Sequence, residues 1–437
     1  MNRYERYKDS GIPWLGKVPE HWETWKITHA IDLIGSGTTP KSDNAEYYDG
    51  DILWVTTSEL RENFISDTKQ KVSDNAIKEY SALKIYPADS VAMAMYGATI
   101  GRLGILEREA TFNQACCVFG NSKILYYKFL FYWLWHRRPI LISLSNGGGQ
   151  PNLSQDDLKK LKLPIPSYVE QTAIAHYLDT KLGEIDALID KQQTLLEKLA
   201  EQRTAVITHA VTKGLNPAAP MKNSGVEWLG DVPAHWQLIN LKFLCRVKGG
   251  YAFSSDNFSD EGIPVIRISD ILFDGTVDNI NCKRIPLELA PNQKDFELRN
   301  GQLVMAMTGA TIGKISKYCS EDYAYINQRV GKFEVFNSRL NYAFLYHLLN
   351  TSGYQEHIKL TAFGGAQPNI SDSEMVNYQM VLPTMEEQAH IADYLDKETA
   401  KIDRLCDTVN QTIGRLKEYR TALITQAVTG KIKVTDE

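Results

Sequence analysis

Two long segments of the chain carry apolar residues at alternating steps of four and three. They run over about 168–213 and 386–430, contain no proline, and are interrupted only by Gly183, Gly414 and Gly430. Such a pattern predicts one long helix in each segment. The seam positions are Leu178, Leu182, Ile185, Ile189, Leu196 and Leu199 in the first segment, and Leu395, Ile402, Val409, Ile413, Leu416 and Leu423 in the second.

The length of these predicted helices raises the question of what covers their apolar seams. A helix of about 44 residues is about 66 Å long, and an amphipathic rod of that length needs a partner. A two-stranded coiled coil buries such a seam, and the other copy is the nearest candidate. Antiparallel pairing would relate the two halves of the chain by a pseudo-two-fold axis. The alternative is that each helix packs on its own globular domain.

The rest of the chain mixes β-rich runs, short helices and turns rich in glycine and proline. Residues 52–56 and 264–268 are predicted strands, and the aromatic run 126–135 is predicted to be a buried helix. The predicted fold class is α+β, with two similar globular domains joined by two long helices in an antiparallel coiled coil. The expected domains are 1–165 and 221–383, and the expected spacer segments are 166–220 and 384–437.

The chain repeats itself in a fixed order. Residues 8–22, KDSGIPWLGKVPEHW, return at 222–236 as KNSGVEWLGDVPAHW. The other repeated stretches are MAMYGATIG at 93–101 with MAMTGATIG at 305–313, Asn-Gln at 113–114 and 327–328, and GGQPN at 148–152 with GAQPN at 365–369. Because order and spacing are kept, the sequence indicates a duplication of one half of about 215 residues.

The overall charge is slightly acidic. The 437 residues include 48 Lys and Arg against 53 Asp and Glu, which gives a net charge of −5. This balance argues against a protein that coats nucleic acid by bulk charge, but it leaves local DNA binding open. Residues 1–165 hold 20 basic and 19 acidic residues, and 221–383 hold 15 and 17. Phosphate contacts would therefore come from basic side chains gathered on one face, together with backbone N–H groups.

Motifs of catalysis and metal binding are missing from the sequence. The six cysteines form no C-x-x-C pair, which argues against zinc-ribbon and thioredoxin-like sites. Pro40 stands where a P-loop needs glycine, and no G-x-S-x-G or H-E-x-x-H sequence occurs. The repeated His21 and His235 belong to a tryptophan-rich motif and are expected to be structural. No apolar run is long enough to span a bilayer, and we expect a cytoplasmic protein without a metal site.

The repeated stretches and the two long helices, which begin near Glu170-Gln171 and Glu387-Gln388, resemble the specificity subunit of type I restriction–modification systems. The resemblance covers nearly the whole chain. It implies that each globular domain is a target-recognition domain for one half of an asymmetric, split double-stranded DNA sequence. It also implies that the paired helices set the spacing of the half-sites and dock two methylation subunits.

The same resemblance assigns the chemistry to other chains. Adenine methylation would belong to the methylation subunits, and ATP-driven translocation and DNA cleavage to the restriction subunits. S-adenosylmethionine, ATP and magnesium are therefore expected in partner subunits, and no cofactor is expected in this chain. The alternative from another class is a coiled-coil scaffold protein with little or no DNA binding.

Candidates for DNA contact follow from the two copies. Strand alternation would align Thr56 and Ser58 with Arg267 and Ser269, and a change from Thr to Arg suits a position that chooses a base, because arginine commonly reads guanine. Tyr96 likewise becomes Thr308 within a repeated motif. The glycine-rich loops add Gln150, Asn152, Gln367 and Asn369, and the Gly-Ala-Thr-Ile-Gly stretches add Thr99 and Thr311.

Basic candidates for phosphate contact occur in both halves. They are Lys41, Lys69, Lys71, Arg102, Arg137 and Arg138 in the first half, and Lys283, Arg284, Lys314 and Lys317 in the second. Arg102 and Lys314 form the best-matched pair, because both directly follow Ala-Thr-Ile-Gly. The alternative for each basic residue is ordinary solvated surface charge.

Overall fold

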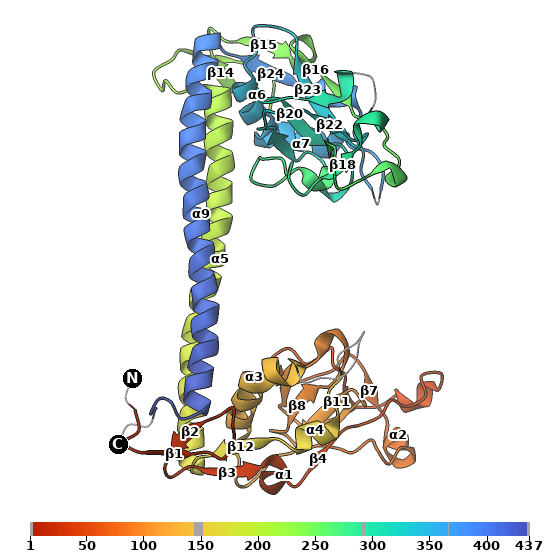
Figure 1. Cartoon of the computed structure of the whole chain (residues 1–437), viewed down its shortest axis with the longest axis vertical. Helices are drawn as coiled ribbons and strands as arrows, with labels where there is room; N and C mark the ends of the chain where they lie inside the picture. The colour runs from red at the N-terminus through yellow and green to blue at the C-terminus, as the bar shows by residue number, and fades with distance from the viewer. Residues whose placement is uncertain (1–2, 144–151, 291–293, 366, 435–437) are drawn as a thin grey trace. The chain divides into compact units, whose positions relative to one another are not determined.

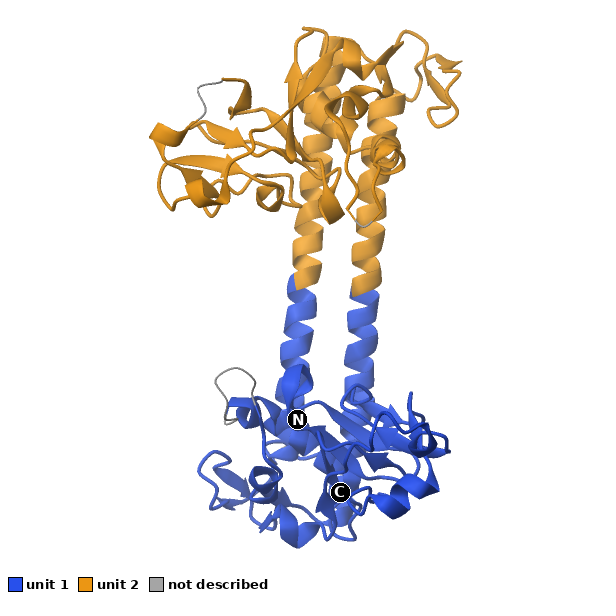
Figure 2. Ribbon diagram, turned by 90° about the vertical axis from the view of Figure 1, so that its right-hand side faces the viewer, with its two compact units in different colours: residues 1–192, 411–437 blue, residues 193–410 orange. Residues whose placement is uncertain are grey.

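The computed structural model describes residues 3–143, 152–290, 294–365 and 367–434. The chain divides into two compact units (Figure 2). Unit 1 contains residues 1–192 and 411–437, and unit 2 contains residues 193–410. Two long helices, α5 (Tyr168–Lys213) and α9 (Met385–Val428), each contribute to both units. Their bounds confirm the two helices predicted from the heptad pattern.

Unit 1 contains a five-stranded sheet of order β4-β11-β8-β9-β6 and a three-stranded sheet of order β10-β5-β7. Its strands are β1 Tyr7–Asp9, β2 Lys17–Pro19, β3 Glu23–Lys26, β4 Ile34–Gly35, β5 Ile52–Val55, β6 Asn63–Ile65, β7 Lys71–Val72, β8 Val91–Ala94, β9 Leu103–Leu106, β10 Thr111–Phe112, β11 Cys116–Phe119 and β12 Lys162–Ile165. Its shorter helices are α1 Ile27–Ala30, α2 Asp74–Glu79, α3 Tyr127–Ser143 and α4 Gln155–Lys159, with 3₁₀ turns at Ala45–Tyr47 and Gly97–Thr99.

Unit 2 contains two four-stranded sheets, β16-β23-β20-β21 and β18-β17-β22-β19. Its strands are β13 Met221–Asn223, β14 Asp231–Pro233, β15 Gln237–Asn240, β16 Cys245–Gly249, β17 Ile263–Ile266, β18 Lys283–Ile285, β19 Glu297–Leu298, β20 Leu303–Ala306, β21 Ile315–Lys317, β22 Ala324–Ile326, β23 Val330–Val335 and β24 Gln379–Leu382. Its shorter helices are α6 Tyr342–Leu349, α7 Ser352–Thr361 and α8 Asp372–Val376, with 3₁₀ turns that include Ile268–Asp270 and Gly309–Thr311.

The two units share a scaffold. In unit 1, β5 pairs parallel with β10 and antiparallel with β7, and in unit 2, β17 pairs parallel with β22 and antiparallel with β18. The antiparallel pairs β3–β12 and β15–β24 also correspond. These matched pairings confirm that the repeat seen in the sequence is a repeat of structure.

The two long helices run antiparallel within each unit (Figure 1). In unit 1, Leu178 and Leu182 of α5 share a core with Leu423 of α9. In unit 2, Ile207 of α5 shares a core with Leu395 of α9. The start of one helix therefore packs with the end of the other in both units, as a pseudo-two-fold repeat requires.

The heptad seam is largely buried. The seam side chains at most 8% exposed are Leu178, Leu182, Ile185, Leu199, Leu395, Ile402, Val409, Ile413 and Leu423. Ile189, Leu196 and Leu416 are half-buried. A fully buried aliphatic side chain contributes about 2 kcal/mol, so the seam is a major source of pairing free energy.

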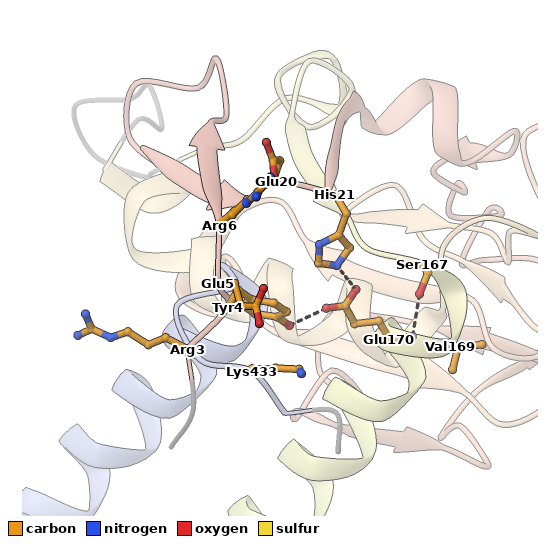
Figure 3. Close-up of a pocket in the computed structure, with 10 residues that line it drawn as sticks. All are labelled: Arg3, Tyr4, Glu5, Arg6, Glu20, His21, Ser167, Val169, Glu170 and Lys433. Atoms are coloured by element: carbon orange, nitrogen blue, oxygen red, sulfur yellow. Dashed lines mark hydrogen bonds and ion pairs between the residues drawn. The ribbon is translucent and has the colours of Figure 1, made fainter. Parts of the chain in front are cut away.

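A carboxylate ties the first turn of each long helix to its repeated His-Trp motif. In unit 1, Glu170 accepts from Trp22 Nε1 at 3.0 Å, contacts His21 Nε2 at 3.0 Å and accepts from the Tyr4 hydroxyl at 2.6 Å. Figure 3 shows Glu170 with Tyr4 and His21 at a pocket of about 840 Å³. Both repeated histidines are therefore structural partners of a helix start, as the sequence predicted.

The matching carboxylate in unit 2 is Glu387. It accepts from Trp236 Nε1 at 3.1 Å and contacts His235 Nε2 at 2.8 Å. Burial opposes its charge, but hydrogen bonds from His235, Trp236 and Thr384 outweigh this and lower the pKa of Glu387 to about 2. The carboxylate is therefore held ionised where the helix N-terminus also favours negative charge.

The glutamine after each glutamate joins three backbone groups. Gln171 is fully buried; its Oε1 accepts from Tyr126 N at 2.8 Å, and its Nε2 donates to the carbonyls of Ile124 and Pro166 at 2.9 Å. Gln388 does the same for Asn341 N and the carbonyls of Arg339 and Pro383. The repeated Glu-Gln pair thus anchors each long helix to its globular part.

The aromatic run at 126–135 forms the first half of α3, as predicted. Phe129, Trp133 and Leu134 are fully buried in the core of unit 1. Pro139 lies inside this helix. The run is therefore core packing rather than an exposed stacking surface.

Candidate nucleic-acid interface

The expected recognition strands end one or two residues early. β5 ends at Val55 and β17 at Ile266, so Thr56 and Arg267 lie just beyond the strands. The prediction that strands run on through these residues was wrong. The reason is a carboxylate three residues later: Glu59 Oε2 accepts from Thr56 N at 2.9 Å, and Asp270 Oδ2 accepts from Arg267 N at 2.9 Å.

The side chains at these two turns differ between the units. In unit 1, Thr56 Oγ1 donates to Glu59 Oε2 at 2.5 Å and lies 2.8 Å from Ser58 Oγ. In unit 2, the Arg267 guanidinium pairs with Asp270 at 3.3 and 3.4 Å, and its side chain remains 35% exposed. Each carboxylate orients a different hydrogen-bonding group on the same scaffold.

The exposed Ser58 and Ser269 complete these turns. Ser58 Oγ donates to Glu59 Oε2 at 3.1 Å, and Ser269 Oγ donates to Asp270 Oδ1 at 2.9 Å. Both serines therefore belong to the same carboxylate-centred turn rather than to an alternating strand face.

The repeated Asn-Gln dipeptides lie directly beside these strand ends. Asn113 N donates to Val55 O at 2.9 Å, and Asn327 N donates to Ile266 O at 2.9 Å. The following residues, Gln114 and Gln328, are exposed. Neither glutamine was among the sequence-based candidates, although the repeat of the dipeptide was a signal that pointed to them.

The Gly-Ala-Thr-Ile-Gly stretches form identical loops. Gly97 and Gly101 have φ of 72° and 75°, and the matching glycines in unit 2 have 76° and 81°. These left-handed conformations favour glycine. Arg102 N donates to Thr99 O at 3.0 Å, and Lys314 N donates to Thr311 O at 3.1 Å. The backbone conformation of the loop therefore explains why its two glycines occur in both copies.

Asn152 and Asn369 lie beside the same loops. Asn152 bridges to Tyr96, and Asn369 bridges to Thr308. Asn152 and Asn369 are both exposed, and so is Gln367. Gln150 lies outside the described residues.

One surface in each unit therefore gathers most of the candidates. In unit 1 the Tyr96 hydroxyl donates to Gln114 O at 2.5 Å, which joins the Gly-Ala-Thr-Ile-Gly loop to the Asn-Gln segment beside the end of β5. Burial raises the pKa of the Tyr96 hydroxyl, so it stays protonated and donates near neutral pH. The gathered candidates are Thr56, Ser58, Tyr96, Thr99, Arg102 and Asn152 in unit 1, and Arg267, Ser269, Thr308, Thr311, Lys314 and Asn369 in unit 2.

Two lysines lie opposite β5 and β17 on the neighbouring strands, at registers one residue apart in the repeat. Lys71 lies opposite Leu53 in the β5–β7 pair, and Lys283 lies opposite Val265 in the β17–β18 pair. Lys283 is exposed, and Lys71 forms an ion pair with Asp67 at 3.4 Å. The exposed Lys41 lies between β4 and β5, and the exposed Lys69 lies between β6 and β7, so neither joins the gathered set.

Other basic candidates have structural partners. Arg284 donates to the carbonyls of Gly262 and Asn279 at 3.0 and 3.1 Å, and Lys314 Nζ donates to Ile271 O at 2.7 Å. Arg138 forms an ion pair with Glu62 at 2.7 Å. Lys317 is exposed on β21.

Arg137 was a mistaken candidate. It is only 3% exposed, and its guanidinium lies 3.4 Å from the ring centroid of Trp14. Burial lowers its pKa to about 10, so it remains charged at neutral pH. Because α3 carries it into the interior of unit 1, it cannot serve as an exposed phosphate contact.

Within the described residues, no group of three or more His, Cys, Asp or Glu side chains is arranged to hold a metal ion. Among the described helices, none combines the length and apolar character needed to cross a membrane.

Comparison with known proteins gives a consistent match. The family model of the type I restriction modification DNA specificity domain matches residues 19–198 and 233–414. The MjaVIII specificity subunit of Methanocaldococcus jannaschii is 24% identical over 96% of this chain and 94% of its own length. The EcoKI specificity subunit of Escherichia coli K12 is 23% identical over 95% and 90%.

Solved structures share the fold. A chain from a study of complex assembly and conformational transition of the type I R-M system aligns with a TM-score of 0.74 at 16% identity, covering 95% of this chain and 99% of that one. The HsdS subunit from Thermoanaerobacter tengcongensis aligns with a TM-score of 0.55 at 16% identity, over 95% and 98%. With one matched domain in each structural repeat, the chain belongs to the type I restriction–modification DNA specificity family.

Proposed function

We propose that this chain is the DNA specificity subunit of a type I restriction–modification complex and that each unit reads one half of a split, asymmetric duplex target. The observation that carries the proposal is the gathered surface, which occurs once in each unit on the same scaffold. Its backbone contacts repeat, whereas Thr56 becomes Arg267 and Tyr96 becomes Thr308. A constant frame with changed donors and acceptors suits two half-sites of different sequence.

Base readout is assigned to the turns after β5 and β17. Arg267, oriented by Asp270, offers N–H donors that match the N7 and O6 acceptors of guanine. Thr56 offers a hydroxyl, which donates or accepts and therefore reads less selectively. Gln114 and Gln328 add amide groups beside these turns, and the bidentate amide pattern suits adenine.

Phosphate contact is assigned to the basic residues around these turns. Lys71 and Lys283 lie on the strands that pair with β5 and β17. Arg102 follows the repeated loop in unit 1. The near-neutral charge of each globular part means that a few such contacts position the DNA, while base contacts select the sequence.

The long helices are assigned the role of spacer and docking element. They would set the separation of the half-sites and bind two methylation subunits. Restriction and translocase subunits would then join this complex. In this assignment the chain is not catalytic, S-adenosylmethionine, ATP and magnesium belong to partner subunits, and the complex acts in the cytoplasm with no membrane partner.

The test is selection of duplexes from a random pool by the full chain assembled with its methylation subunits. The expected result is one split sequence, enriched at moderate salt. No enrichment, with weak binding that is equal for all duplexes, would favour the scaffold alternative instead.

The spacer assignment has its own test. One heptad inserted into each long helix, between 192 and 193 and between 410 and 411, keeps the seam in register and lengthens each helix by about 10 Å. The selected half-sequences should stay the same while the gap between them grows by about three base pairs. Altered half-sequences with an unchanged gap would contradict this assignment.

A further inference from the structure

Unit 2 carries an exposed aromatic residue on a turn that unit 1 does not have. In unit 1, two residues separate the buried Leu60 from Asn63, which pairs with Gly104. In unit 2, four residues separate the equivalent Ile271 from Thr276, which bridges to Lys317 in the same parallel sense. The connection is therefore two residues longer in unit 2.

Phe273 lies within this longer connection and is 89% exposed. The turn closes with Leu272 N donating to Thr276 O at 2.9 Å. Asp274 Oδ1 accepts from the backbone N and the hydroxyl of Thr276 at 2.9 and 2.6 Å. A large apolar side chain is thus presented to solvent next to the polar groups of Asp274 and Thr276.

The turn is fixed to the sheet below it. Lys314 Nζ donates to Ile271 O at 2.7 Å, Ser316 Oγ donates to Leu272 O at 3.1 Å, and Lys317 N donates to Gly275 O at 2.8 Å. Gly275 has φ of 84°, and a Cβ there would come within 2.1 Å of the Tyr346 hydroxyl. The exposed ring is therefore held in place before any partner arrives.

The turn belongs to the surface already assigned to DNA. Ile271 directly follows Asp270, which orients Arg267, and Lys314 directly follows the repeated Gly-Ala-Thr-Ile-Gly loop. The Lys314 ammonium lies 3.6 Å from the centroid of the Phe273 ring. A cation beside an exposed ring suits a partner with anionic phosphates next to flat apolar faces.

We propose that Phe273 inserts at a base step of the half-site read by unit 2, with the Lys314 ammonium facing the adjacent phosphate. Apolar side chains used in this way partly unstack the step and bend the duplex. The role is specific to unit 2, because unit 1 lacks the two extra residues. This proposal rests on the proposed function, since it requires that unit 2 binds duplex DNA.

The test uses the full chain with its methylation subunits and a duplex that the wild-type complex has selected. 2-Aminopurine placed at successive positions reports unstacking through increased fluorescence. Besides the increase at the target adenine, which methyltransferases flip out of the stack, a separate increase should occur at one base step of the half-site read by unit 2. Phe273→Ala should remove it and weaken binding about tenfold, in the range that loss of one stacking contact produces.

Leu287→Ala is the matched control, because Leu287 is 67% exposed in the same unit. It should leave both fluorescence and affinity unchanged. The absence of an increase at a separate base step with the wild-type complex would overturn the insertion of Phe273, and so would wild-type affinity with Phe273→Ala. Neither result would affect the proposed function. Loss of methylation-subunit binding with unchanged fluorescence would overturn the insertion in favour of a protein contact. If the wild-type complex selects no sequence at all, the proposed function itself fails.

Discussion

The Arg203 guanidinium of α5 donates to the Asp403 carboxylate of α9 at 3.2 Å in unit 2. The residues that occupy the same places in the repeat, Arg420 and Asp186, form an ion pair at 3.4 Å in unit 1. One pair has its arginine on α5 and the other on α9. This exchange of roles is what a pseudo-two-fold axis between antiparallel helices produces.

The first prediction concerns these ion pairs. Arg203→Glu should destabilise the helix pair in unit 2, because it sets two carboxylates against each other. Asp403→Arg in the same chain should restore most of the loss, with a coupling free energy of about 0.5–1 kcal/mol expected for a partly exposed pair. Hydrogen exchange of peptides from unit 2 is the measurement. Additive effects of the two substitutions would contradict the pairing.

The second prediction concerns the buried glutamines. Gln171→Ala should lower the stability of unit 1 by about 3 kcal/mol, because it leaves a backbone N–H and two carbonyls without their partner. Gln388→Ala should do the same to unit 2. Hydrogen exchange reads the two units separately, so each variant serves as the control for the other. Equal loss in both units with either variant would contradict the assignment, as would no loss at all.

Much of this helix architecture could be predicted from the sequence. The heptad seam and the lack of proline specify two helices, and a duplicated chain suggests how they pair. The role of Gln171 could not be predicted, since its partners at Ile124 and Pro166 lie on separate segments that only the fold brings together. Repetition showed that the residue matters but gave no sign of its three contacts.

The third prediction concerns pH. The pKa of Glu387 is about 2 in the folded protein, against 4.5 for an unperturbed glutamate. Because the folded value is the lower one, its stabilising contribution is complete above about pH 4.5 and declines as the pH falls toward 2. Glu387→Gln should therefore be less stable than wild type near pH 6, and the difference should shrink as the pH is lowered.

Urea unfolding of unit 2 at a series of pH values from 6 to 3 measures this difference. Glu386→Gln is the matched control, since Glu386 is exposed in the same first turn of α9. If the difference in unfolding free energy between Glu387→Gln and wild type does not change with pH, the Glu387 carboxylate is not ionised in the way described.

The fourth prediction concerns base choice. Arg267→Lys keeps the positive charge but loses the planar pair of donors. It should relax selection at one base pair of one half-site by about 1–3 kcal/mol of discrimination, or about 5- to 150-fold. Arg246→Lys, exposed and paired with Glu334, is the control and should change nothing in the selected sequence. Selection from random duplexes checks both, and equal relaxation at every position would contradict a direct base contact.

The recognition surface was less predictable than the helices. The change from Thr56 to Arg267 was visible in the sequence, but the strand pattern placed both residues on a continuous face. The carboxylates of Glu59 and Asp270 instead accept the backbone N–H groups and end the strands. Lys314 matched Arg102 in the repeat, yet its ammonium is bound to Ile271 O and the Phe273 ring, which depends on an insertion present in unit 2 alone.

The central claim is that each unit reads its own half of the target, and mapping methylated adenines across a genome tests it most directly. The complex containing this chain should methylate one split sequence with a fixed gap. Replacing residues 221–383 by the corresponding part of a related specificity subunit should change one half of that sequence and leave the other half and the gap unchanged. A change in both halves, or methylation at sites without a split pattern, would contradict the account.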